Sequence, residues 1–191
     1  MKTQGSGCLM SLAVMLILAT SAIPSAQAQT FTVLYNFTGS SDGANPYAGL
    51  FRDTAGNLYG TTTLGGSSND GTVFVVDTSG TEAVLHSFSG ADGIGPYGAV
   101  IMDAKGNLYG TTQNGGTGCS GTGCGTVFEL TPKGGGRWTE TVLHKFTFNP
   151  DGGDPNAGLI QDAKGTLYGT TEIGGTGGQH RRNGVQGKQG R

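Results

Sequence analysis

GNLYGTT at residues 56–62 recurs unchanged at residues 106–112 and again, as GTLYGTT, at residues 165–171. Each copy follows an Asp at the same distance and precedes a Gly-Gly pair. Self-similarity at an interval of about 50 residues is typical of an array of small supersecondary units. The sequence therefore indicates an architecture more directly than an activity.

Each repeat contains four runs that predict short β-strands, because Thr, Phe and β-branched residues alternate between glycine-rich turns. In order along a repeat, the runs are 33–37, 84–88 and 142–146; then 48–53, 98–103 and 157–162; then 57–62, 107–112 and 166–171; then 71–76 and 125–130. Helical periodicity is nearly absent beyond the N-terminus. We predict an all-β chain of tandem four-stranded repeats that form an incomplete β-propeller of about three blades. A β-solenoid or an open stack of antiparallel sheets is the alternative.

The N-terminus predicts export. Lys2 precedes an apolar run at residues 9–19 that is too short to span a bilayer, and an A-x-A pattern ends at Ala28. We expect residues 1–28 to be a secretory signal peptide and Gln29 to be the mature N-terminus, with an uncleaved membrane anchor as the alternative. The expected location is extracellular or periplasmic, with association with the cell surface as a further option.

Composition narrows the class of protein. The chain has 191 residues, 38 of them glycine, a net charge of −2 and only 13% charged residues. Glycine without a three-residue period is not collagen and suits many tight turns. The low charge provides no basic face for nucleic acid, and nothing after residue 28 resembles a membrane span.

Cys119 and Cys124 are the cysteines of the expected mature chain. Exported proteins enter an oxidising compartment, so we predict a disulfide that closes this glycine-rich loop. A zinc site is the alternative, but the sequence offers no further Cys or His pair at zinc spacing.

The C-terminal tail breaks the repeat. We assign the repeat domain to residues 29–176, in rows 31–80, 81–136 and 137–176, and predict a disordered or frameshifted tail at 177–191, where a fourth strand should follow. We interpret this as truncation or a frame shift near residue 177. The alternative is a natural flexible terminus on a chain that self-associates to complete the ring.

The full row reads Leu-His-x-Phe, Asp-Gly-x-x-Pro, Ala-Gly-Leu-Ile-x-Asp-x-x-Gly-Asn-Leu-Tyr-Gly-Thr-Thr, Gly-Gly and Gly-Thr-Val-Phe. This pattern resembles the GloVer tandem repeat of exported bacterial "choice-of-anchor" proteins over about residues 31–175. The resemblance implies export and a propeller-like fold, and often a surface-sorting anchor. It implies no established activity, and the chain shows no recognisable anchor.

Acidic residues recur at two places in each row. Those before the hairpin glycine are predicted to cap turns: Asp53, Asp103 and Asp162. The others lie in Asp-Gly turns: Asp42, Asp92 and Asp151. Asp151 and Asp154 could supply part of a calcium site, but their spacing misses the known calcium loops, so turn formation is favoured. No other cofactor is indicated.

Aromatic residues and histidines also recur. Tyr59, Tyr109 and Tyr168 could form a ligand-binding row that stacks on sugars, or they could pack between sheets with their hydroxyl groups bonded to backbone. His86 and His144 stand where row one has Tyr35, which favours packing or a hydrogen bond to a neighbouring strand over catalysis or metal ligation.

We therefore expect an exported, non-enzymatic repeat protein, a binding or structural module of the cell envelope or exterior. A glycan or a surface protein is the expected ligand. The alternatives are a polysaccharide-active hydrolase or lyase on a propeller scaffold and a non-functional fragment of a longer propeller. The active site of an enzyme should contain residues that depart from the repeat pattern. The residues that do so are the Cys119–Cys124 loop, Trp138 with Arg137, and Asp154.

Overall fold

The computed structural model describes residues 30–119, 121–176 and, for the backbone, 183–189. The chain divides into a unit at Met1–Thr32 and a unit at Val33–Arg191, and every described strand belongs to the second. The predicted signal peptide and Gln29 lie outside the described residues. Within the described part, no helix is long and apolar enough to cross a membrane.

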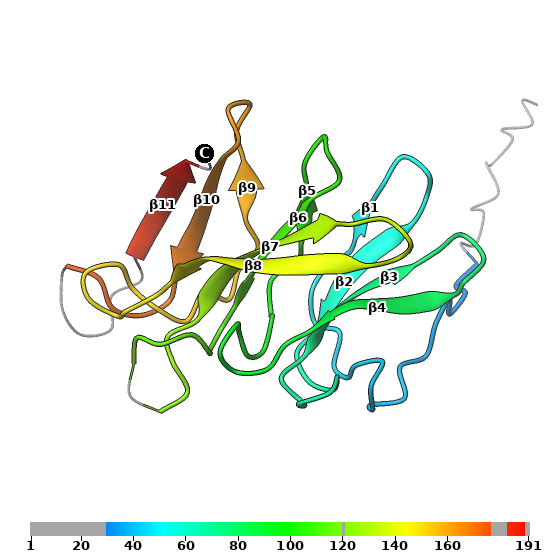
Figure 1. Cartoon of the computed structure of the whole chain (residues 1–191), viewed down its shortest axis with the longest axis horizontal. Helices are drawn as coiled ribbons and strands as arrows, with labels where there is room; N and C mark the ends of the chain where they lie inside the picture. Colours follow the sequence, from blue (N-terminus) through cyan, green and yellow to red (C-terminus); the bar gives the residue numbers. More distant parts are fainter. Residues whose placement is uncertain (1–29, 120, 177–182, 190–191) are drawn as a thin grey trace, which may run out of the picture. The chain divides into compact units, whose positions relative to one another are not determined.

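The second unit consists of consecutive antiparallel sheets, here named blades 1, 2 and 3 (Figure 1). Blade 1 contains β1 (Phe51–Arg52), β2 (Leu58–Thr62), β3 (Thr72–Val76) and β4 (Glu82–Ser87) in that order. Blade 2 contains β5 (Ile101–Met102), β6 (Leu108–Thr112), β7 (Thr126–Pro132) and β8 (Trp138–Lys145). Blade 3 has the order β11 (Asn183–Gln189), β10 (Thr166–Thr171), β9 (Ile160–Gln161). Successive sheets with strands in chain order are the arrangement of propeller blades, which confirms the predicted all-β, propeller-like class.

The sheets do not begin where the sequence rows begin. The run that comes first in a row is the outermost strand of the preceding blade, since β4 pairs with β3 and β8 pairs with β7. A tight turn explains this pairing, because Gly80 N donates to the carbonyl of Asp77 and returns the chain directly beside β3. Among the described residues, no sheet precedes the first run, residues 33–37, and this run is not a strand.

The tail also differs from expectation. Residues 177–182 lie outside the described residues, but Asn183–Gln189 form β11 and pair antiparallel with β10 instead of being disordered. Backbone groups make this ladder, so it does not require the Thr-Val-Phe pattern seen in β3 and β7. The sequence prediction rested on side-chain composition, namely one aliphatic residue, no aromatic residue, and four cations with a histidine.

The LYGTT glycine has a packing role. A Cβ on Gly60 would lie 2.6 Å from the Phe74 ring, and one on Gly110 would lie 2.5 Å from the Phe128 ring. Each glycine therefore leaves room for the cross-strand Phe to lie flat over β2 or β6.

The core lies mainly between blades. One cluster joins Tyr59 and Val73 of blade 1 to Val100, Leu108 and other residues of blade 2. A second cluster joins Tyr109 of blade 2 to Leu159 and Leu167 of blade 3. Burial of these apolar side chains holds neighbouring blades together.

Candidate functional site

The hairpin aspartates cap their turns, as predicted. Asp53 accepts hydrogen bonds from Asn57 N and Nδ2, both at 2.8 Å, and from the Tyr59 hydroxyl at 3.2 Å. Burial alone would raise the pKa of Asp53, but these hydrogen bonds outweigh it and lower the pKa. Asp103 and Asp162 make corresponding contacts.

The tyrosines of the LYGTT motif serve the same turns. Tyr109 donates to Asp103 at 3.2 Å and also lies 3.1 Å from Glu129, and Tyr168 donates to Asp162 at 3.0 Å. Burial, followed by the Glu129 contact, raises the pKa of Tyr109 far above its usual value. The rings of Tyr59 and Tyr109 are buried between blades. The ligand-binding role of the tyrosine row stays a prediction, and Tyr168 is its more exposed member.

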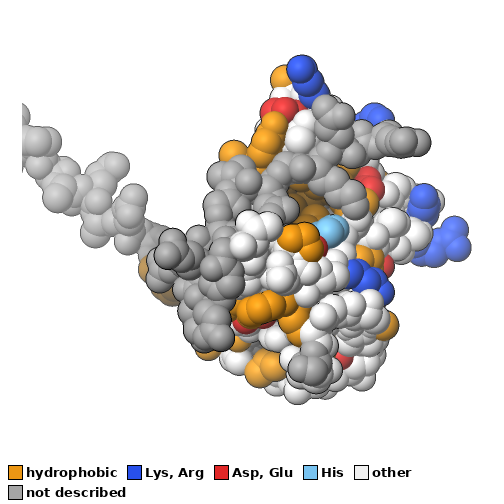
Figure 2. Space-filling model, turned by 90° about the vertical axis from the view of Figure 1, so that its left-hand side faces the viewer, with side chains coloured by type: hydrophobic (Ala, Val, Ile, Leu, Met, Phe, Trp, Pro, Cys, Tyr) orange, Lys and Arg blue, Asp and Glu red, His pale blue; other side chains and the backbone are white. Residues whose placement is uncertain are grey.

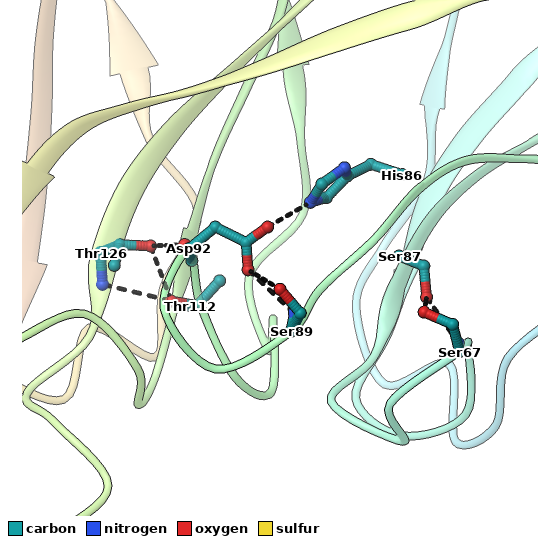
Figure 3. A network of polar contacts seen from close by, with 7 residues as sticks. All are labelled: Ser67, His86, Ser87, Ser89, Asp92, Thr112 and Thr126. Carbon is teal, nitrogen blue, oxygen red and sulfur yellow. Dashed lines mark hydrogen bonds and ion pairs between the residues drawn. The ribbon is translucent and has the colours of Figure 1, made fainter.

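The histidines form a second repeated network (Figure 3). Asp92 accepts from His86 Nε2 at 3.0 Å and from Ser89 N at 2.8 Å, while its carbonyl accepts from Thr126 Oγ1 at 2.9 Å. Burial lowers the pKa of His86, although Asp92 opposes this effect. The network fastens the turn after β4 to blade 2.

The same network recurs in the other rows. His144 Nε2 lies 2.7 Å from Asp151, and in row one the Tyr35 hydroxyl donates to Asp42 at 3.0 Å. Tyr and His are interchangeable here because each donates one hydrogen bond to the carboxylate. The histidines do make hydrogen bonds, but their partners are the turn carboxylates Asp92 and Asp151 and not the predicted neighbouring strand.

Glu140 is a half-buried carboxyl group with a strongly raised pKa. Burial first, and then the charge of Asp92, raise the pKa of Glu140 to about 7, with Lys145 partly opposing. One of its oxygen atoms is buried without a hydrogen-bond partner. Glu82 repeats the arrangement beside Asp42, with a raised pKa and a similar orphan oxygen. Glu140 and Glu82 occupy the same position in successive repeats and have matching surroundings. We therefore attribute the raised pKa of Glu140 to its place at the blade boundary and not to a unique site.

The candidate calcium ligands have other partners. Both carboxylate oxygen atoms of Asp151 accept hydrogen bonds, from Thr147 and from His144. Asp154 lies elsewhere in the loop, where burial and the nearby Glu172 raise its pKa. Among the described residues, no group of three or more His, Cys, Asp or Glu side chains is placed to hold a metal ion.

The symmetry-breaking residues are only partly brought together. Cys119 and Cys124 form the predicted disulfide. The carbonyl of the buried Cys124 accepts from Asp154 N at 2.9 Å, so the loop contacts blade 3. Trp138 instead packs at the edge of the cluster between blades 1 and 2, and Arg137 is exposed in the β7–β8 turn.

An exposed pair of aromatic rings was missed by sequence reasoning. Tyr47 and Tyr97 follow the repeated proline in rows one and two, and their rings stack with centroids 5.8 Å apart and planes 19° apart. Tyr47 is 70% exposed and Tyr97 is 39% exposed. Asn156 has the same place in row three and donates to Glu172 at 2.6 Å. The recurring Pro-Tyr pair was the available signal. We name Tyr47 and Tyr97 the tyrosine shelf.

Surface charge is sparse around the array. Figure 2 shows one face, where hydrophobic side chains lie among uncharged polar ones and the Lys and Arg side chains gather toward one side.

Tandem sheets, repeated turn networks and interblade cores define a β-propeller-like repeat protein. The Gloeobacter/Verrucomicrobia repeat matches residues 22–185, and the chain belongs to this family. No curated protein matches the chain in sequence.

Two solved structures resemble the fold. One is PorZ, described as an essential bacterial surface component of the type-IX secretion system of the oral-microbiome bacterium Porphyromonas gingivalis, with a TM-score of 0.50 and 19% identity. The match covers 81% of this chain and 20% of PorZ. The other is described as a candidate gluconolactonase, with a TM-score of 0.45, 17% identity, and coverage of 72% of this chain and 47% of that one. The chain thus spans less than half of either protein.

Proposed function

We propose that this protein is an exported, non-enzymatic module of the cell envelope or exterior that binds a glycan through the tyrosine shelf. The exposed, stacked rings of Tyr47 and Tyr97 are the observation that carries the proposal. Aromatic faces of this kind offer apolar area at low entropic cost and present a polar hydroxyl group beside it. The Cys119–Cys124 disulfide supports an oxidising location outside the cytoplasm.

A non-enzymatic role is supported by how the polar groups are used. Asp92 and Asp103 bind turn backbone, and the same contacts recur from row to row. A catalytic group is needed once, whereas a group that fixes a turn is needed in every repeat. Asp154 differs between rows, and it lies near Glu172, whose charge helps to raise its pKa, so this carboxylate pair is an exception to the repeated pattern.

The test is a binding screen of the exported chain against soluble bacterial polysaccharides and their oligosaccharides, followed by calorimetry. Replacing both shelf residues, Tyr47→Ala and Tyr97→Ala, should weaken glycan binding at least about tenfold. Lys105→Ala, an exposed change in a hairpin, is the control and should bind normally. Binding that survives loss of both rings contradicts the shelf, and binding of a surface protein instead would reassign the ligand class.

A further inference from the structure

The two outer edges of the blade array match the two sides of the interface that joins neighbouring blades inside the chain. Thr61 of blade 1 donates to the carbonyl of Gly98 at 3.2 Å, and Thr111 of blade 2 donates to the carbonyl of Ala157 at 3.0 Å. Both threonines are buried. Thr170 has the same place in blade 3 and is exposed. The matching acceptor position in row one is Ala48, at the opposite edge.

Apolar side chains at the edges show the same complementarity. Val100 and Leu159 are 2% and 5% exposed because the preceding blade covers them, whereas Leu50, in the same place in blade 1, is 53% exposed. On the other side of the interface, Phe51 and Ile101 pack against the interblade clusters. Their counterpart Ile160 in blade 3 is 69% exposed. The contact between neighbouring blades is made twice within the chain, between blades 1 and 2 and between blades 2 and 3. The outer edge of blade 1 exposes one side of this contact, and the outer edge of blade 3 exposes the other.

Residues 33–37 resemble an outer strand without its sheet. At the end of β4, Phe88 packs edge-on against Phe128 of the next blade, with ring centroids 5.1 Å apart. Phe37 packs in the same way against Phe74, at 4.8 Å. The segment thus holds the position of the last strand of a blade that would precede blade 1. Its Val33 is more than half exposed.

Within the described residues, blade 3 has no counterpart of β4 and β8, and this segment could supply that strand. In blades 1 and 2 a fourth strand pairs antiparallel with β3 or β7, but the sheet of blade 3 ends at β11. The outer edge of β11 therefore corresponds to the place that β4 and β8 fill beside β3 and β7. An unpaired strand edge of this kind is a ready template for strand addition.

A surface depression marks the rest of the contact. It has a volume of about 460 Å³ and lies between residues 35–39 and 44–46. At the matching place in blades 2 and 3, Pro96 and Pro155 are buried, and Gly95 N donates to the carbonyl of Asp70 in the preceding blade. Pro46, by contrast, is exposed. The depression therefore lies where a preceding blade would insert its turn.

From these observations we infer that two copies of the chain associate head to tail, with residues 33–37 of each copy completing blade 3 of the other. Leu50 of one copy then packs on Ile160 of its partner, and Thr170 donates to the Ala48 carbonyl. Two chains of three sheets each give six blades, which lies within the range of closed propellers. In such a ring both junctions are the same heterologous contact, and a two-fold axis relates them. This inference goes beyond glycan binding and does not depend on it.

The test uses the full chain, exported and purified, in sedimentation and light-scattering experiments across a concentration series. A dimer is expected at high concentration. Leu50→Asp disables one edge and Ile160→Asp disables the other, and each variant alone should be monomeric, with association weakened at least about 100-fold by the buried charge. Both positions are exposed in the single chain, so circular dichroism and thermal melting should show normal folding.

Mixing the two variants gives the decisive result. A head-to-tail contact needs one intact edge from each copy, so Leu50→Asp and Ile160→Asp together should form a heterodimer through their undamaged edges. A contact between like edges would leave one single variant dimeric and would overturn the inference. A wild-type chain that stays monomeric at every concentration would also overturn it and would assign the edges to another protein or to further repeats.

Discussion

The boundary between blades 1 and 2 and the free edge of blade 1 have the same pattern of small and apolar residues but different environments. At the boundary, Val100 is sealed in an apolar cluster and Gly98 accepts a hydrogen bond from the neighbouring blade. At the free edge, Leu50 and Ala48 repeat the pattern, and Leu50 is exposed. A repeat residue is therefore stabilising only where a neighbour covers it, as expected when stability is a sum of repeat and interface contributions.

The largest contrast should come from placing a charge at this position. Val100→Asp would bury an unpaired carboxylate and should lower the free energy of unfolding by about 4 kcal/mol. Leu50→Asp, the matched change at the free edge, should alter it by less than about 0.5 kcal/mol. Urea unfolding at a concentration where the chain is monomeric measures both. Equal losses would mean that the edge is already covered within a single chain.

A smaller contrast is expected from adding one methyl group. A Cβ on Gly158 would lie 2.8 Å from the carbonyl oxygen of Ala99 in blade 2, so Gly158→Ala should cost about 1–3 kcal/mol. Gly49 has the same place in blade 1, and no heavy atom lies within 4 Å of its added Cβ. Gly49→Ala should leave monomer stability unchanged within about 0.5 kcal/mol. Thermal melts of the two variants test the difference, and a destabilised Gly49→Ala monomer would contradict it.

Much of the blade could be predicted because its signals are local. Alternation in residues 71–76 and the Asp-Gly hairpin before residues 57–62 each specify a strand or a turn without reference to distant residues. The blade boundaries are not local, since a first run can pair with either neighbouring sheet. The turn from Asp77 to Gly80 decides this pairing. The predicted rows begin just after this turn, so they assigned the strand that follows it to the next repeat.

The candidate site was less accessible to prediction. The turn role of Asp53 follows from its spacing to the hairpin glycine, but its bond to the Tyr59 hydroxyl depends on how two strands face each other. Tyr47 and Tyr97 lie about 50 residues apart in sequence, and only the stacking of blades brings their rings together. The Pro-Tyr pair indicated a repeated position without indicating exposure.

The hydrogen bond from Thr111 across the blade boundary has an exposed counterpart at Thr170. Thr111→Val removes the donor to the Ala157 carbonyl and should lower the free energy of unfolding by about 1 kcal/mol. Thr170→Val, at the exposed counterpart, should have no measurable effect on the monomer but should weaken association between copies. Urea unfolding and sedimentation together separate the two effects. A loss of monomer stability in Thr170→Val would show that its hydroxyl group has a partner within the chain.

An effect of similar size is expected from pH at the boundary between blades 1 and 2. The pKa of Glu140 is raised to about 7 by burial and by Asp92, so between its ordinary value and 7 the folded chain holds a proton that the unfolded chain has released. Stability should therefore fall as pH rises through this window, and the loss should be complete above about pH 7. With screening at this half-buried site, we expect a loss of about 1 kcal/mol.

Glu140→Gln should remove this loss, so the variant should gain stability relative to the wild type as pH rises from 5 to 8. His86, whose pKa is lowered, titrates in the same window with the opposite sign, and taking the difference between wild type and variant cancels its contribution. Glu82→Gln is the matched change beside Asp42 at the free edge, where the pKa is also raised. Because no preceding blade covers that edge, its effect should be smaller than that of Glu140→Gln. Melting temperatures across this pH range measure both variants, and an equal gain from the two would mean that the blade boundary adds nothing to the burial of Glu140.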